Sequence, residues 1–126
     1  MRLLNHLHNP EKMILYRKRY NDSARGRFKK LELRAKRAGI LIDLNINDFT
    51  EWYESQDFKC YYCKRQIILN TGVQKLDSPC IDRRDNTLGY SLDNIALSCN
   101  RCNMAKGSWF TEQEMLEIAD KYLSGR

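Results

Sequence analysis

The spacing of apolar residues predicts two helices in the first third of the chain. Residues 23–39 begin with a serine that can cap a helix and end with a glycine, which fits the position just past a helix end. Between them an apolar stripe recurs at helical spacing, formed by Phe28, Leu31, Ala35 and Ala38. Residues 9–20 show a briefer version of this pattern, with Asn9 as a cap and Pro10 at the first helical position.

The pattern then changes from a helical period to alternation. Apolar residues recur at every second position over residues 40–46, at Ile40, Ile42, Leu44 and Ile46, which predicts a short strand. Asn47 is predicted to cap a third helix, which carries Phe49, Trp52 and Tyr53 on one face. This aromatic trio could stack on bases, but its spacing favours a face that packs in the core.

Shorter apolar segments in the second half predict a hairpin followed by helices. Strands are predicted over residues 79–82 and 94–97, with a polar loop between them. A helix follows through residues 98–107, and Thr111 opens a capping box at the start of a last helix over residues 111–123. Helices mixed with a small hairpin indicate an α+β fold.

Positive charge is concentrated near the N-terminus. Residues 1–42 contain twelve Lys and Arg against three Asp and Glu, whereas residues 43–126 contain ten against thirteen. A basic segment on a mildly acidic remainder is typical of a protein that binds a polyanion, although such charges can also form the solvated face of a helix. The nucleic-acid-binding candidates on the second helix are Arg25, Arg27, Lys29, Lys30, Arg34, Lys36 and Arg37.

Length and composition describe a small globular protein. A chain of 126 residues is one domain by length, and we expect a basic helical nucleic-acid-binding extension over 1–57 and a domain over 58–126 that contains all five cysteines. With 42% hydrophobic and 30% charged residues, the composition argues against the membrane and disordered classes. No apolar run is long enough for a secretory signal or a membrane span, so we expect an intracellular protein without a membrane partner.

Four of the five cysteines form two Cys-x2-Cys pairs. The pairs are Cys60 with Cys63 and Cys99 with Cys102, separated by 35 residues. Redox pairs and buried free thiols are the alternatives, but two matched pairs in an intracellular chain favour a structural zinc site with four thiolate ligands. Cys80 stands apart from the pairs and is expected to be a buried thiol.

A second candidate site lies between the cysteine pairs. If the predicted hairpin packs on the helix that begins near Cys99, the amide of Asn103 could face Asp82 at the end of the first strand. A carboxylate and an amide oxygen form a sparse, hard site of the kind that holds Mg²⁺ when phosphate and water supply the other ligands. Lys106, one turn after Asn103, is placed for a phosphate contact.

These residues also carry a family resemblance. In order, the chain has C-x2-C, IDR-x-DN-x2-GY-x2-DN and C-x2-CN-x2-KG. Over about residues 58–110 this pattern resembles the HNH endonucleases of the ββα-metal (His-Me finger) superfamily, in the phage and bacterial subset with four zinc-binding cysteines. The resemblance implies a small zinc-stapled ββα-metal core, here with basic N-terminal helices and a C-terminal helix.

The resemblance also implies roles for particular residues. Asp82 and Asn103 would hold a catalytic Mg²⁺ or Mn²⁺ ion, and the four paired cysteines would hold Zn²⁺. Asn94 would be the middle residue of the HNH motif and would brace the loop beside Asp82. Arg83 stands where most HNH enzymes have the histidine that activates water. A guanidinium cannot act as a base, but with the neighbouring Arg84 it could bind phosphate.

The residue that would accept the proton of the attacking water stays open at this point. Asp85, Tyr90 and bulk solvent are the three options, because His6 and His8 lie far away in sequence. Asp85, Tyr90 and the residues between them are also the types that build turns.

Two functions are compatible with these features. The first is a metal-dependent endonuclease that nicks or cuts double-stranded DNA, and cleavage of both strands by one site would favour a dimer. The second is a catalytically inactive, zinc-dependent nucleic-acid-binding protein with an HNH-like fold. A zinc-stapled module that binds protein would leave the basic segment unexplained.

Overall fold

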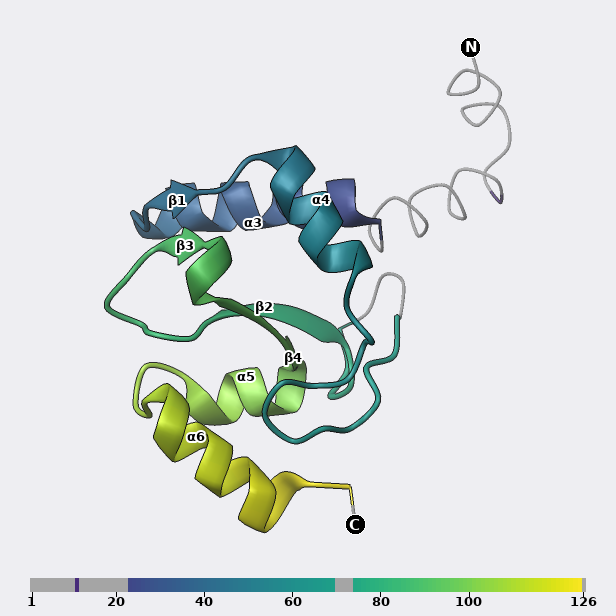
Figure 1. The fold of residues 1–126 in the computed structure, drawn as a ribbon, viewed down its shortest axis with the longest axis vertical. Coiled ribbons are helices and arrows are strands. Elements are labelled where there is room, and N and C mark those ends of the chain that lie inside the picture. The colour runs from purple at the N-terminus through teal and green to yellow at the C-terminus, as the bar shows by residue number, and fades with distance from the viewer. Residues whose placement is uncertain (1–10, 12–22, 70–73, 126) are drawn as a thin grey trace.

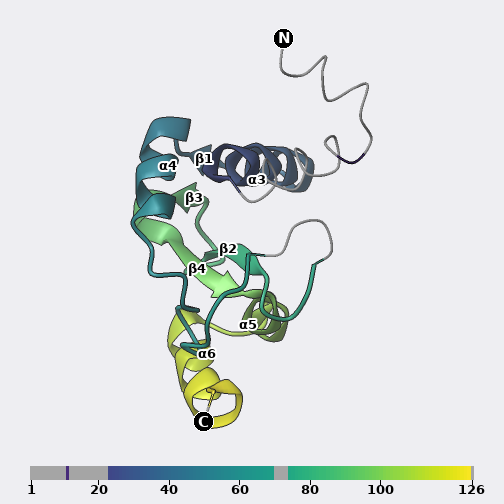
Figure 2. The ribbon, with the colours of Figure 1, turned by 90° about the vertical axis from the view of Figure 1, so that its right-hand side faces the viewer.

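A three-layer arrangement positions the candidate site. The computed structural model describes residues 11, 23–69 and 74–125. Its elements are α3 (Ala24–Ala38), β1 (Ile42–Asp43), α4 (Ile46–Glu54), β2 (Pro79–Arg83), β3 (Tyr90–Ser91), the 3-10 turn η1 (Leu92–Asn94), β4 (Ile95–Cys99), α5 (Asn100–Lys106), α6 (Glu112–Ile118) and the π-helical turn η2 (Ala119–Leu123). The β2–β4 hairpin lies between α3 and α4 on one side and α5 and α6 on the other (Figures 1 and 2).

Helix α3 confirms the prediction over residues 23–39. The Ser23 hydroxyl accepts a hydrogen bond from the Gly26 amide, and Gly39 adopts the left-handed conformation with φ 70° at the C-terminal cap. Phe28, Leu31 and Ala35 are buried as expected, whereas Ala38 is exposed. The helix expected over residues 9–20 falls almost wholly outside the described residues.

The predicted strand over residues 40–46 is shorter in the structure. Side chains alternate between half-buried and exposed from Leu41 to Ile46, as the sequence pattern indicates, but only Ile42 and Asp43 pair with another strand. Their partner is β3, which runs parallel to β1. The chain leaves the pairing after two residues because Asn45 already caps the next helix.

The cap of α4 was predicted two residues too late. Asn45, and not Asn47, accepts a hydrogen bond from the Asp48 amide at 2.8 Å, and Asn47 lies inside the helix. The two asparagines are equally good caps by composition, and the hydrophobic face decides between them. A helix that starts at Ile46 turns both Phe49 and Tyr53 into the core.

We expect Asn45→Ala to lower the free energy of unfolding by about 1 kcal/mol, because the substitution removes the side-chain oxygen that accepts a hydrogen bond from the Asp48 amide at the start of the helix. Asn47→Ala is the matched control, with an expected change within about 0.5 kcal/mol, since it is an exposed helix position. Urea denaturation of both variants measures the difference. Equal losses in the two variants would contradict the assignment of the cap.

The hairpin pairs in the register that the site requires. Strands β2 and β4 are antiparallel, with Asp82 opposite Ala96 and Arg83 opposite Ile95. The buried core combines Phe28 and Phe49 from the first helices with Ile95 and neighbours from the hairpin. Phe49 and Tyr53 are buried and Trp52 is half-buried, so the aromatic trio packs in the core.

The two predicted parts of the chain share this core. Leu31 comes from the range 1–57 and Ile95 from the range 58–126, and the β1–β3 pairing also joins the two ranges. The boundary at residue 57 stays a prediction. None of the helices among the described residues is both long and apolar enough to cross a membrane.

Candidate active site

Four cysteines from two segments meet in the core. Cys60 and Cys63 lie on a tight turn after α4, Cys99 is the last residue of β4, and Cys102 lies in α5. All four are buried, and their sulfur atoms lie within 4.8 Å of one another. Zinc bonded to sulfur at about 2.3 Å in a tetrahedron separates the sulfurs by about 3.8 Å. The Cys63 and Cys99 sulfurs are 3.7 Å apart, so the cluster fits zinc.

Local backbone geometry positions these thiols. In the first pair, Lys64 has a positive φ of 66°, and its amide donates to the Cys60 carbonyl, which folds the chain tightly between the two cysteines. In the second pair, Cys99 was expected on the helix but instead caps it: its sulfur accepts a hydrogen bond from the Cys102 amide at 3.4 Å. Two different turns therefore direct two thiols each toward one point.

The charge balance of the cluster also fits a cation. Hydrogen bonds from Cys102 and Cys99 lower the pKa of the Cys60 thiol. Hydrogen bonds with Cys60 and Cys99, together with burial, raise the pKa of the Cys102 thiol. The first thiolate thus suppresses ionisation of its neighbour, and four thiolates can coexist here only when a metal ion supplies compensating positive charge.

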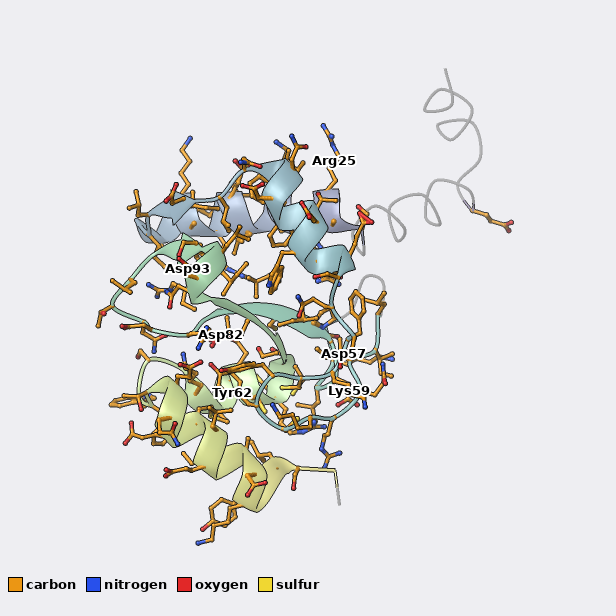
Figure 3. The ribbon with its side chains drawn as sticks, in the orientation of Figure 1. Arg25, Asp57, Lys59, Tyr62, Asp82 and Asp93 are labelled. Carbon is orange, nitrogen blue, oxygen red and sulfur yellow. The ribbon has the colours of Figure 1, made fainter. Side chains whose placement is uncertain are left out.

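Asp82 lies at the end of β2 with its carboxylate buried between the hairpin and α5, and Figure 3 shows it beside Tyr62. The Tyr62 hydroxyl donates a hydrogen bond to Asp82 Oδ2. Lys106 Nζ lies 3.2 Å from the same oxygen. Burial raises the pKa of the Asp82 carboxyl, although both of these contacts oppose the change.

The side chain of Lys106 is not placed for a phosphate contact, as the sequence predicted, but lies inside the protein. Its side chain is fully buried, and its ammonium donates to the Arg83 carbonyl at 2.7 Å and to Asn86 Oδ1 at 3.1 Å as well as contacting Asp82. A contact with phosphate would require this side chain to move.

Asn103, one turn earlier on α5, is half-buried, and its side-chain amide makes no hydrogen bond within the described residues. Residues three apart on a helix share a face, so Asn103 lies on the same face of α5 as Lys106.

Asn94 braces the loop that follows Asp82. Its Oδ1 accepts from the Asp85 amide at 2.8 Å, and its Nδ2 donates to the carbonyls of Asp85 and Gly89 at 3.0 and 2.9 Å. The side chain is only 6% exposed. One buried side-chain amide therefore holds both ends of the turn between β2 and β3.

Asn94→Ala is expected to lower the free energy of unfolding by about 2–3 kcal/mol, because three backbone groups would lose their partner in a buried site. Asp93→Ala is the control, since this neighbouring side chain is exposed, and its expected effect is within about 0.5 kcal/mol. Denaturant titration gives both values. A loss of less than about 1 kcal/mol in Asn94→Ala would contradict the bracing role.

Arg83 is held by the same loop. Its Nη1 donates to the carbonyls of Asn86 and Leu88 at 2.9 and 3.0 Å, and its guanidinium lies 5.6 Å from the centre of the Tyr90 ring. Tyr90 is buried beneath it.

Hydrogen bonds from Thr87 lower the pKa of the exposed Asp85 carboxyl, which makes Asp85 a weaker base and supports its role in the turn.

Among the remaining predicted cations, Arg84 and Lys29 form ion pairs, and most of the others are exposed. Arg84 pairs with Glu112 at the start of α6, and its guanidinium lies over the Tyr61 ring. Glu112 also accepts from the Tyr61 hydroxyl at 2.6 Å. On α3, Arg27 is half-buried, and six cations are exposed: Arg25, Lys29, Lys30, Arg34, Lys36 and Arg37.

Sequence reasoning missed Tyr62 and Glu112. Tyr62 and its neighbour Tyr61 look alike between the two cysteines, yet only Tyr62 points to Asp82. The acidic residue at position 112 is an ordinary feature of a first helical turn. Both contacts depend on which elements meet in space, so no local signal distinguishes these residues.

Comparisons with known proteins agree with the overall fold. The solved structure of the rare-cutting HNH restriction endonuclease PacI is similar, with a TM-score of 0.63 and 25% identity, over 75% of this chain and 72% of that one. Uncharacterized protein R423 of Acanthamoeba polyphaga mimivirus is 31% identical over 101 residues, and these span 79% of this chain but 17% of that relative. No protein-family model matches. The chain therefore has a fold similar to that of this HNH endonuclease, together with a four-cysteine cluster that is compatible with zinc.

Proposed function

We propose that this protein is a metal-dependent DNA endonuclease of the HNH type that hydrolyses phosphodiester bonds in double-stranded DNA. The observation that carries the proposal is the buried Asp82 carboxylate, which lies next to the last residue of β2 and contacts Lys106 of α5 on an HNH fold. Asn94 supports it, because it braces the adjoining loop. The assignment to the phage and bacterial subset stays a prediction.

The donor chemistry fits two different metals. The four buried thiols suit a structural zinc ion, which leaves no open position for chemistry. Asp82 and Asn103 offer oxygen ligands of the kind that Mg²⁺ or Mn²⁺ prefers, and Asn86 and the Arg83 carbonyl add oxygens beside Asp82. When bound, such a cation would supply Lewis-acid stabilisation of charge on the scissile phosphate.

The chain itself would bind and orient the DNA. Exposed cations on α3 would contact the phosphate backbone, and Arg25 marks this helix layer in Figure 3, on the other side of the hairpin from α5. Backbone contacts by Lys and Arg give strong salt dependence and little sequence preference. Arg83 stabilises the loop through the two hydrogen bonds of its Nη1 to backbone carbonyls. Its other guanidinium nitrogens can still donate hydrogen bonds to a phosphate.

Two of the three candidate proton acceptors, Asp85 and Tyr90, are poorly placed to act as a base. Asp85 is bonded by Thr87, which lowers its pKa, and Tyr90 is buried beneath Arg83. Neither arrangement favours a general base. We therefore propose that the proton of the attacking water passes to solvent.

The test is cleavage of supercoiled plasmid by the zinc-loaded protein with Mg²⁺, with Mn²⁺ or without an added divalent ion. We expect nicked or linear product only when a divalent cation is present, and weaker binding as salt rises. A gel separates nicking from double-strand cutting, and ultracentrifugation of the complex shows whether a dimer binds. Salt-sensitive binding without cleavage in either metal would overturn the proposal.

One observation favours the alternative, a zinc-dependent nucleic-acid-binding protein without catalysis. The Asp82 carboxylate is already paired with Lys106, and Arg83 already bonds to two loop carbonyls. A site whose charges are satisfied internally has less need of a divalent cation. The plasmid assay distinguishes the two functions, because the alternative predicts binding without cleavage.

A further inference from the structure

The Lys106 ammonium occupies a site lined by oxygen atoms. It lies 2.7 Å from the Arg83 carbonyl, 3.1 Å from Asn86 Oδ1, and 3.2 and 3.5 Å from the two oxygens of Asp82. The Lys106 side chain has no exposed surface. These oxygens come from the end of β2 and the loop after it, and the ammonium comes from α5. The contacts therefore converge through tertiary structure around one positive charge.

The chemistry of this site is that of a cation-binding site. A carboxylate, a side-chain amide oxygen and a backbone carbonyl are the ligand types that hard cations take from proteins. An ammonium group can donate three hydrogen bonds to these oxygens. Compared with a divalent cation, however, it carries only one positive charge and cannot coordinate water or phosphate oxygens as a metal ion does. Two cations a few ångströms apart repel strongly in a buried site, so the ammonium and a metal ion cannot both bind Asp82.

We propose that Lys106 and a divalent cation compete for Asp82, so that Lys106 acts as a built-in cation that lowers the metal affinity of the free protein. This inference rests on the proposed function, in which Asp82 is a ligand of the divalent metal. When the metal binds, the Lys106 ammonium leaves the oxygens and becomes accessible to solvent and to a phosphate. Lys106 is thus a positioning residue that couples metal binding to exposure of a cation.

The first experiment uses the wild-type, zinc-loaded protein and measures the accessibility of Lys106. An amine-reactive acylating reagent is applied with and without Mn²⁺, and peptide mass spectrometry gives the rate of modification of each lysine. Release from a fully buried pair is expected to raise the rate at Lys106 by roughly tenfold or more. Lys59, which is exposed on the cysteine turn and labelled in Figure 3, is the internal control and should not change. An unchanged rate at Lys106 while Mn²⁺ binds to Asp82 would overturn the inference.

The second experiment measures Mn²⁺ affinity directly, by the electron paramagnetic resonance signal of the free ion. Lys106→Met removes the competing charge and keeps much of the side-chain volume, and we expect it to bind Mn²⁺ roughly tenfold more tightly than wild type. Lys59→Met is the matched control and should bind like wild type. Adding Asp82→Asn to Lys106→Met should abolish the gain.

Circular dichroism and zinc content show whether Lys106→Met is folded, and the labelling experiment does not depend on this variant. Equal or weaker Mn²⁺ binding by folded Lys106→Met would overturn the inference, as would a gain that survives Asp82→Asn. The plasmid assay reports separately on the proposed function. Metal-dependent cleavage without a gain in affinity rejects only the competition, whereas a gain in affinity without cleavage by wild type rejects only the nuclease activity.

Discussion

Removal of zinc from the four-cysteine cluster is expected to unfold the protein. Structural zinc contributes roughly 10–16 kcal/mol of apparent binding free energy in small zinc proteins, while whole domains are stable by only about 5–15 kcal/mol. The four thiols lie in the core at the junction of the hairpin and α5, so loss of the metal removes the bonds that hold these segments together. We expect a chelator to abolish the cooperative thermal transition seen by circular dichroism.

The chain provides a matched pair of cysteine variants for this prediction. Cys99→Ser removes a zinc ligand and should reproduce the effect of the chelator, with less than one zinc per chain by elemental analysis. Cys80→Ser alters a cysteine that is also buried but lies outside the cluster, and it should keep the metal and the transition. In the wild type we expect the four cluster thiols, and with them the buried Cys80 thiol, to react with a thiol reagent only after the chelator is added. Full zinc content in Cys99→Ser would contradict the assignment.

Asp82→Asn is expected to reduce metal-dependent cleavage by at least about a hundredfold, because Lewis-acid catalysis is worth several kcal/mol and about 1.4 kcal/mol changes a rate tenfold. The substitution keeps the shape of the side chain but removes the charge that balances Lys106. Loss of one partner from a buried ion pair also destabilises the fold, by up to about 3–5 kcal/mol. Activity is therefore compared at a temperature at which circular dichroism shows both proteins to be folded.

Asp85→Asn is the control for this variant. It makes the same chemical change three residues away, but Asp85 is exposed and its carboxylate only builds a turn with Thr87. Asparagine supports the same turn, so cleavage should stay within about twofold of wild type. Similar losses in both variants would show that the effect of Asp82→Asn reflects the loop or its charge and not a metal ligand.

Much of the fold follows from periodicity in the sequence. The caps at Ser23 and Gly39, the hairpin strands and the capping box of Thr111 with Glu114 are all present in the structure. These features depend on a few neighbouring residues, which is why a local pattern predicts them. The predicted cap of α4 was wrong because two asparagines, Asn45 and Asn47, are both suitable caps. Which one is used depends on which helix start buries Phe49 and Tyr53 in the core.

The candidate site was harder to predict because it is assembled by contacts between distant segments. The cysteine pairs carry their own spacing signal, and the structure brings their sulfurs together as predicted. By contrast, Lys106 is an ordinary helix-end lysine in the sequence, and only the packing of α5 on β2 buries it against Asp82. The roles of Asp82, Arg83, Asn94 and Asn103 in catalysis stay predictions.

The parallel pairing of β1 with β3 has a consequence for protein engineering. Gly89 lies so close to β1 that a Cβ atom there would be 2.3 Å from the Leu41 carbonyl oxygen, and the Tyr90 amide donates to the same oxygen at 2.9 Å. A fragment that starts at residue 58 would lack this partner and would expose the far side of the hairpin. To transplant the zinc hairpin into another protein, a designer would therefore need to carry the segment from residue 40 onward with it and keep glycine at position 89.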